Sequence, residues 1–246
     1  LRHCRELCDT RALGFRERFE RRLRAGKEAR AVGEARMLRS EHVPLAIGRR
    51  EDTSVRKQYG AYDDAQLQQY VNEIGQRLAK ASHRPELEYH FLVVDSPDVN
   101  AFALPGGYIY ITRGILVYLN SEAELAAVLG HELGHVTARH SVQQISAATA
   151  ANVGANILQI FVPQARGPLG DNTINLLGGA LLSGYGREQE LEADRLGAEY
   201  LTRTGYDPQA MVKVVAVLKN QELFDAEVAK AEGRQPRAYH GLFASH

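Results

Sequence analysis

The sequence predicts a single α+β domain that is mostly helical and contains a small sheet. Three observations support this prediction. Residues 88–112 hold three short runs of β-branched and aromatic residues, separated by turn signals. Apolar residues at helical spacing occur before these runs, in residues 61–82, and after them, in residues 121–140. The chain has 246 residues, of which 44% are hydrophobic, and this is enough for one sizeable core.

The N-terminal part differs in charge from the rest. Residues 1–50 hold 14 Lys and Arg against 7 Asp and Glu, a net charge of +7, whereas the whole chain has a net charge of zero. We expect residues 1–39 to form a charged helical arm and residues 40–246 to form the domain, with 40–50 as a short connector around Pro44. A basic arm could touch a membrane surface, although a solvated helix explains it more simply. We expect no nucleic-acid partner.

Targeting signals are not visible in this chain. No apolar run reaches the 18 residues of a membrane span, and no apolar segment follows the basic start as in a signal peptide. Cys4 and Cys8 are the two cysteines, and they form no disulfide framework. These features leave the cellular compartment open.

A helix and a three-stranded region precede the most informative motif. Residues 61–82 read as an amphipathic helix, with Asp63 or Asp64 as its N-cap. The last two strands would form a hairpin closed by Pro-Gly-Gly, and an extended peptide could pair with its outer edge. An ordinary buried hairpin explains the pattern equally well. The strands are expected at residues 88–94, 100–104 and 108–112.

The HELGH sequence at residues 131–135 predicts a metal site. Four helical steps nearly close a turn, so His131 and His135 lie on one face and both imidazoles can bind one ion. Glu132 lies beside this site without being a ligand, where it can move a proton between the attacking water and a leaving amine. This arrangement is typical of zinc peptidases. Ser121 with Glu124 forms a capping box that starts the helix.

Two glycines in the same helix suggest a close contact. Gly130 and Gly134 each cost about 1 kcal/mol relative to Ala in a helix, so we expect another backbone to approach there. His140, nine residues after His131, would lie on the opposite side of a continuous helix, and we interpret it as structural. The alternative for the motif is an ordinary core helix without a metal. Two histidines and a glutamate would then each need a hydrogen-bond partner in an apolar setting.

A catalytic zinc usually has three protein ligands, so a third must come from elsewhere. Residues 187–201 form a charged helix with the candidates Glu188, Glu190, Glu192 and Asp194. Glu190 and Asp194 share one face, whereas Glu192 is about 200° from Glu190 and should face solvent. We therefore predict Glu190 as the ligand and Asp194 as the acceptor of a ligand histidine's ring N–H. An ion-paired surface helix is the alternative.

The residues between these helices give weaker signals. We expect a helix over residues 141–162, a Pro- and Gly-rich loop over 163–173, and a small apolar helix over 174–185. The last of these could lie on a membrane or cover the cleft, but a packing helix is the simpler interpretation.

Three motifs, HELGHVTARH, NAFALPGGYIYITRGIL and ELEAD, together resemble peptidase family M48, with its HtpX, BepA and CAAX-protease types. The resemblance covers residues 40–246 and is closest to the soluble BepA-like envelope members. It implies a gluzincin-type zincin fold, one zinc ion per chain, and a periplasmic or envelope location with a role in protein quality control. It also implies zinc binding by His131, His135 and Glu190, catalysis by Glu132, and support by Asp194. Substrate strands would pair along Asn100, Ala101, Phe102, Ala103 and Leu104.

The C-terminus departs from the family pattern. Members carry a His-Pro followed by an Arg near the active site, whereas this chain reads LFASH up to His246. As a hypothesis, His246 either stabilises the oxyanion or caps the zinc in a latent state, with His240 as the rival. We expect a zinc-dependent endopeptidase acting on unfolded or misfolded envelope proteins. The alternatives are a zinc-bound chaperone or assembly factor with latent activity, and a structural metal site, which usually needs four ligands.

Overall fold

The structure is a computed structural model that describes residues 42–151 and 185–233. The chain divides into two compact units, Leu1–Val43 and Pro44–His246, and the description below concerns the second. Several expectations lie outside the described residues: the arm at 1–39, the loop at 163–173, most of the apolar helix at 174–185, and both His240 and His246. The division into an arm and a domain therefore stays a prediction.

A small sheet lies at the centre of this unit, and it consists of the three strands that the sequence predicts. Its strands are β1 (His90–Val94), β2 (Ala101–Leu104) and β3 (Tyr108–Thr112). The order is β1-β3-β2, with β1 parallel and β2 antiparallel to β3. The hairpin of β2 and β3 is thus confirmed, and its turn places Gly106 and Gly107 at φ values of 85° and 96° that favour glycine. β2 forms one edge of the sheet.

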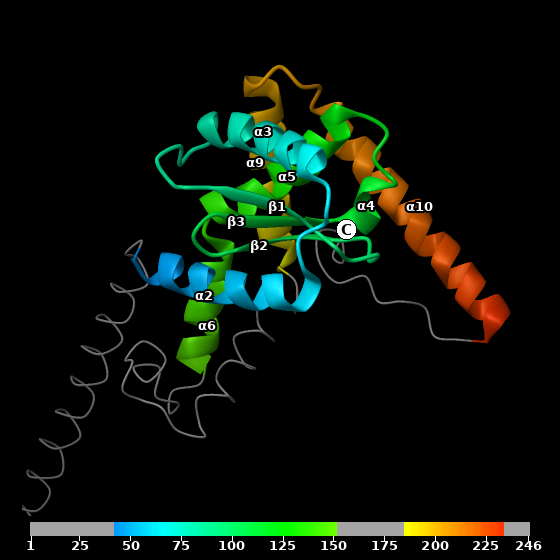
Figure 1. Cartoon of the computed structure of the whole chain (residues 1–246), viewed down its shortest axis with the longest axis horizontal. Helices are drawn as coiled ribbons and strands as arrows, with labels where there is room; N and C mark the ends of the chain where they lie inside the picture. Colours follow the sequence, from blue (N-terminus) through cyan, green and yellow to red (C-terminus); the bar gives the residue numbers. More distant parts are fainter. Residues whose placement is uncertain (1–41, 152–184, 234–246) are drawn as a thin grey trace, which may run out of the picture. The chain divides into compact units, whose positions relative to one another are not determined.

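Helices cover both faces of the sheet, with α3 (Ala65–Lys80) and α5 (Glu122–Thr137) on one side and α2 (His42–Tyr59) on the other (Figure 1). The strand residues alternate between these two layers because successive side chains point to opposite faces. Towards α3 and α5 lie Phe91, Val93, Ala101, Ala103, Ile109 and Ile111. Towards α2 lie Leu92, Val94, Phe102, Leu104, Tyr108 and Tyr110.

The expected connector over residues 40–50 is wrong, because α2 occupies His42–Tyr59. Pro44 is the third residue of this helix. In the first turn a backbone N–H has no intrahelical partner, so proline is tolerated there and does not break the helix. Gly48 then allows close packing, since a Cβ at that position would lie 2.0 Å from the carbonyl oxygen of Pro105. The Tyr110 hydroxyl also donates to Asp52 on α2 at 2.7 Å.

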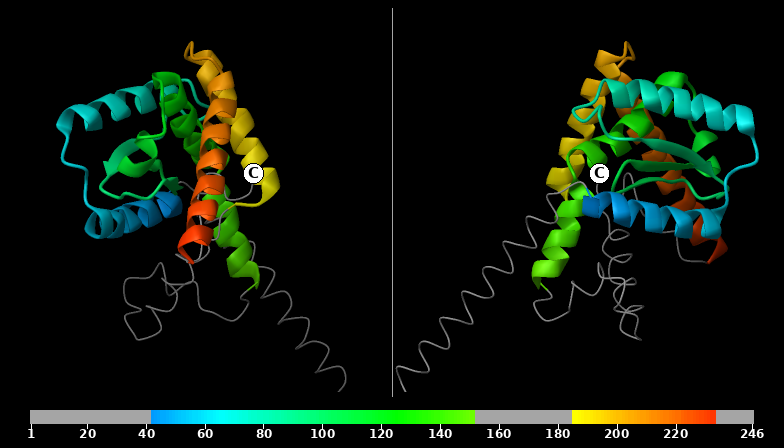
Figure 2. Two further views of the ribbon diagram at one scale, coloured as in Figure 1. Left: turned by 90° about the vertical axis from the view of Figure 1, so that its right-hand side faces the viewer. Right: turned by 60° about the vertical axis from the view of Figure 1, so that its left-hand side comes forward.

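Helices α3 and α9 (Arg187–Arg203) agree with the ranges that the sequence predicts, whereas the helix expected over residues 141–162 is described only as far as Ala151, as α6 (His140–Ala151). Asp64 is the N-cap of α3 and accepts a hydrogen bond from the backbone N–H of Leu67 at 3.0 Å. The short helix α4 (Arg113–Leu116) leads from β3 towards α5. Helices α9 and α10 (Gln209–Glu232) pack alongside α5 (Figure 2). The charged helix expected at 187–201 is therefore α9, while α10 was not predicted.

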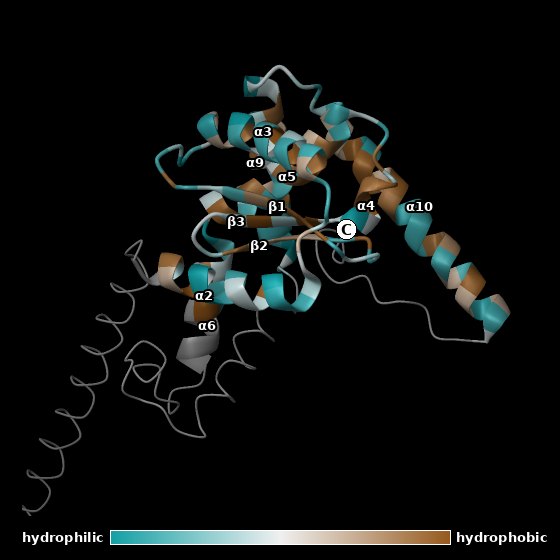
Figure 3. Cartoon of the chain, in the orientation of Figure 1, coloured by the Kyte–Doolittle hydropathy of each residue, from teal (hydrophilic) through white to brown (hydrophobic). Residues whose placement is uncertain are grey.

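Hydrophobic residues concentrate on the strands and on the buried stretch of α5, and hydrophilic ones on the outer turns of α2 and α3 (Figure 3). The large apolar residues of α5 all lie in the core: Leu125, Val128, Leu129, Leu133 and Val136. Within the described ranges, no helix combines the length and the apolar character needed to cross a membrane.

Candidate active site

Helix α5 carries the HELGH sequence through the core. Ser121 caps its first turn by accepting from the backbone N–H of Glu124 at 3.3 Å. The predicted capping box is altered, because the Glu124 carboxylate accepts from the N–H of Asn120, not from that of Ser121. All residues from Glu124 to Val136 are buried. The polar side chains of the motif must therefore find their partners inside the protein.

The close backbone contact expected at the two glycines is made by α9. A Cβ on Gly134 would lie 2.7 Å from the carbonyl oxygen of Ala193, and one on Gly197 would lie 3.0 Å from the backbone N of His131. A Cβ on Gly130 would lie 3.4 Å from the carbonyl oxygen of Gly197, which is an ordinary contact. Small residues on both helices thus let α9 approach α5, and this brings Glu190 to the histidines.

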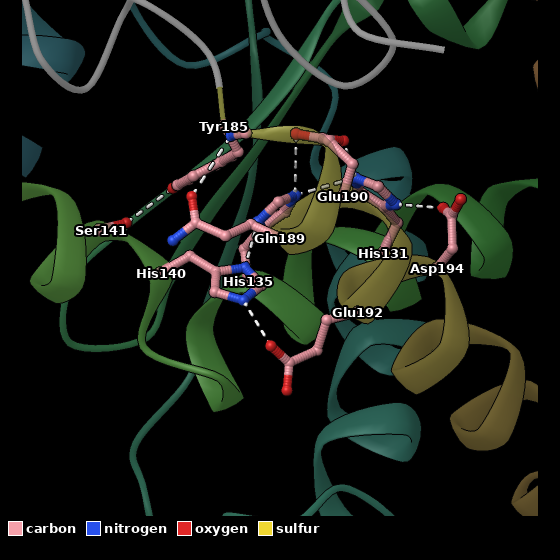
Figure 4. A network of polar contacts seen from close by, with 10 residues as sticks. His131, His135, His140, Ser141, Tyr185, Gln189, Glu190, Glu192 and Asp194 are labelled. Carbon is pink, nitrogen blue, oxygen red and sulfur yellow. Dashed lines mark hydrogen bonds and ion pairs between the residues drawn. The ribbon is translucent and has the colours of Figure 1, made fainter.

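His131, His135 and Glu190 meet at one point, with one ligand atom from each lying within 4.8 Å of the others (Figure 4). The two histidine Nε2 atoms are 2.9 Å apart. The Glu190 carboxylate lies 3.4 Å from Nε2 of His131 and 3.8 Å from Nε2 of His135. All three residues are buried. The structure thus brings together the three residues that the sequence selected as ligands.

This group has the chemistry and the size of a metal site. Two imidazoles and one carboxylate are common ligands of zinc, and two ligands at about 2 Å from a tetrahedral ion lie roughly 3.3 Å apart. The three distances in the group lie on either side of that value. Each histidine also uses Nδ1 for a partner outside the group, which directs both Nε2 atoms towards the common point. The residues present therefore fit a divalent cation.

The electrostatics of the group favour positive charge. Burial lowers the pKa of His131, but the carboxylates of Asp194 and Glu190 outweigh it and raise that pKa to about 9. Glu132 is buried next to His131, and burial, with Glu190 nearby, raises the pKa of its carboxyl group to about 8. Three acidic side chains around two imidazoles thus make an environment that stabilises a cation.

Asp194 lies where the sequence placed it. Its Oδ1 is 2.8 Å from Nδ1 of His131, so a ring N–H donated to this carboxylate fixes the tautomer with Nε2 facing the cluster (Figure 4). The sequence left open which histidine Asp194 contacts, and the structure identifies His131.

The expected position of His140 is wrong. The prediction assumed one helix through residue 140, but α5 ends at Thr137 and Arg139 takes a φ of 61°. This left-handed residue interrupts the helix, and α6 (His140–Ala151) begins at His140. The buried ring of His140 therefore turns towards the site, with its Nδ1 2.9 Å from Nδ1 of His135. Glu192 is half exposed, as expected, yet it also contacts His140.

Tyr185 is a site residue that the sequence analysis missed. Its ring stacks on His135 with centroids 3.9 Å apart and an interplanar angle of 18°. Its hydroxyl lies 2.7 Å from Oγ of Ser141, at the start of α6 (Figure 4). Tyr185 comes at the end of an apolar stretch, so its pattern gives no sign of a position beside the cluster of His131, His135 and Glu190. Its position directly before α9, which carries Glu190, is the one available clue.

Comparison with known proteins agrees with this geometry. Residues 65–246 match the model of peptidase family M48. The chain belongs to this family. A beta-barrel assembly-enhancing protease of Escherichia coli is 32% identical over 67% of this chain and 35% of its own length. That of Yersinia pestis is 35% identical over 65% and 34%. The mitochondrial metalloendopeptidase OMA1 of Arabidopsis thaliana is 36% identical over 65% and 32%. The chain thus spans about a third of the length of these relatives.

In this M48 member the predicted substrate strand is β2, except that Asn100 lies just before it. Ala101, Ala103 and Leu104 are buried and Phe102 is half-buried. Thr112 on β3 holds the start of this strand, since its hydroxyl lies 2.8 Å from the Asn100 carbonyl oxygen and it accepts from the Asn100 N–H at 3.1 Å. β2 is an edge strand packed against α5, and its use by a substrate is a matter for proposal.

Proposed function

We propose that this chain is a zinc-dependent endopeptidase with a gluzincin-type zincin fold, in which His131, His135 and Glu190 hold one zinc ion. The observation that carries the proposal is the convergence of these three side chains beside a buried glutamate that is not part of the cluster. Membership of a peptidase family, with relatives named as a protease and a metalloendopeptidase, supports the reaction class.

In the proposed mechanism the protein moves one proton. A divalent cation at the site supplies polarisation of the scissile carbonyl and a lowered pKa for water. Glu132 takes the proton from the attacking water and delivers it to the leaving amine. Burial raises the pKa of its carboxyl group, and a cation at the site would lower it again, because a nearby positive charge favours the carboxylate form that accepts the proton. Asp194 holds the ring of His131 in the tautomer that presents Nε2.

The substrate in this proposal is an extended segment of an unfolded or misfolded protein. Such a segment would add to the edge of the sheet along residues 100–104, where β2 has β3 on its other side. A bacterial periplasmic or envelope location is part of the proposal, and its support is the name of the bacterial relatives, which refers to beta-barrel assembly. Contact with a membrane surface through the basic residues 1–39 belongs to the same proposal.

The test is cleavage of casein by the wild type and by Glu132→Gln, with the zinc content of both proteins measured. We expect Glu132→Gln to retain zinc and to lose roughly 10²- to 10⁴-fold in rate, the usual contribution of a general acid–base residue. Equal cleavage by both proteins would remove Glu132 from the mechanism. Zinc binding without cleavage by either would favour the chaperone alternative, which aggregation assays with an unfolded client would then test.

A further inference from the structure

A chain of hydrogen bonds leads from His135 away from the metal cluster. Nδ1 of His135 lies 2.9 Å from Nδ1 of His140, and Nε2 of His140 lies 3.2 Å from Oε2 of Glu192 (Figure 4). The first contact is buried, because both imidazoles are 2% exposed or less. Glu192 lies at the outer end, with its side chain 47% exposed. These hydrogen bonds therefore connect the buried ring of His135 to a carboxylate that is also in contact with water.

Metal binding at the site determines which ring nitrogen carries the hydrogen in each of these hydrogen bonds. A histidine that binds a cation through Nε2 carries its hydrogen on Nδ1. His135 therefore donates from Nδ1 to Nδ1 of His140, which must be the acceptor. The hydrogen of a neutral His140 is then on Nε2, which is the atom that faces the Glu192 carboxylate. Every ring nitrogen has a partner of the correct kind without an additional proton.

A comparison with the other ligand histidine shows what this chain achieves. His131 contacts a carboxylate directly, through Asp194 on α9. At Nδ1 of His135 the partner is the ring of His140, and Nε2 of His140 in turn contacts the Glu192 carboxylate on α9. One helix, α9, thus supplies the proposed ligand Glu190 and both carboxylates that lie behind the imidazoles. Partners of this kind orient a ligand ring and increase its basicity.

From this geometry we infer that His140 and Glu192 are positioning residues, which fix the tautomer and orientation of His135 and thereby tighten metal binding. The inference rests on the proposed metal site. This role differs from that of a buried histidine whose hydrogen bonds only satisfy its own polar groups. Such a histidine would contribute to folding but would leave the affinity for metal unchanged.

The experiment measures zinc affinity by competition with a chromophoric chelator, together with the visible spectrum of the Co²⁺-substituted protein. We expect His140→Leu, which removes the acceptor, to raise the zinc Kd roughly 10- to 100-fold and to alter the Co²⁺ bands. His140→Asn keeps an acceptor near the position of Nδ1, so it should recover most of this loss. Glu192→Ala should raise the Kd roughly tenfold, since it removes only the outer carboxylate.

Glu188→Ala is the matched control, because Glu188 is an exposed acidic residue two positions from Glu190 on the same helix. It should leave both the Kd and the Co²⁺ spectrum unchanged. Wild-type Kd values for His140→Leu and Glu192→Ala would overturn the inference while leaving the proposed metal site intact. If His140→Leu does not fold, Glu192→Ala decides alone. A wild type that binds neither Zn²⁺ nor Co²⁺ would instead overturn the metal site, and this inference with it.

Discussion

Glu122, the first residue of α5, lies in a cluster that joins three parts of the fold. The hydroxyls of Tyr206 and Tyr70 donate to its carboxylate, and Arg77 lies 3.4 Å away. These hydrogen bonds, from Tyr206 first and then from Tyr70, hold the pKa of Glu122 below its usual value. The folded protein thus releases this proton more readily than the unfolded chain does.

The sign of the pH dependence follows from this lowered pKa. The stabilisation is fully present above the unfolded pKa of about 4.3 and is lost as the pH falls through the lower folded value. Because the carboxylate is 40% exposed, we expect Glu122→Gln to cost on the order of 0.5 kcal/mol near pH 6. When thermal unfolding is measured between pH 3 and pH 6, the stabilities of the wild type and of Glu122→Gln should converge at acid pH. A constant difference would contradict this prediction, and Tyr118→Phe is the control outside the cluster.

At the level of single residues the sequence identified the inner part of the site but not its surroundings. His131, His135, Glu190 and Asp194 were predictable because their spacing fixes a helix face. His140 was misplaced because the left-handed conformation of Arg139 depends on packing and gives no local signal, unlike a glycine. Tyr185 was missed because its stacking on the ring of His135 depends on contacts between elements.

The crossing of α5 and α9 is the element-scale feature on which the site depends. Gly134→Ala would place a Cβ 2.7 Å from the Ala193 carbonyl oxygen, so the helices must separate. We expect a net loss of about 1–3 kcal/mol of stability, as is usual for overpacking. Metal affinity should fall as well, because Glu190 moves away from the histidines. Chemical denaturation and a chelator titration measure the two effects.

Gly130→Ala is the matched control for this crossing. It lies one turn earlier on α5, where the added Cβ would be 3.4 Å from Gly197, an ordinary contact. Since alanine favours a helix over glycine by about 1 kcal/mol, this variant should be as stable as the wild type or more stable. Equal losses in both variants would show that the close approach does not determine the effect.

The elements themselves were predicted to differing extents, for physical reasons. The three strands and the helices α3, α5 and α9 have strong periodicity, which local sequence expresses directly. Helix α2 was missed because Pro44 resembles a breaker unless its place in the first turn is known. The parallel pairing of β1 with β3 joins strands that are not adjacent in the sequence, so no turn motif announces it.

At the scale of the whole domain, the proposed metal site links two helices that are distant in the sequence. His131 and His135 lie on α5 and Glu190 lies on α9, so an ion held by all three joins these helices in the folded state. The unfolded chain has no such preformed site. A ligand that binds the folded state alone stabilises it by an amount that grows with the ligand concentration.

Removal of the metal should therefore lower the thermal stability of the entire domain. At a free zinc concentration of 100 times the Kd, the gain is about 2.7 kcal/mol. For a domain of this size, this corresponds to a rise in Tm of roughly 5–10 °C, which a chelator should reverse. His135→Ala keeps Glu132 and the rest of α5 but lacks one proposed ligand, so its Tm should respond far less to zinc. Equal zinc-dependent shifts in both proteins would place the bound ion elsewhere in the chain.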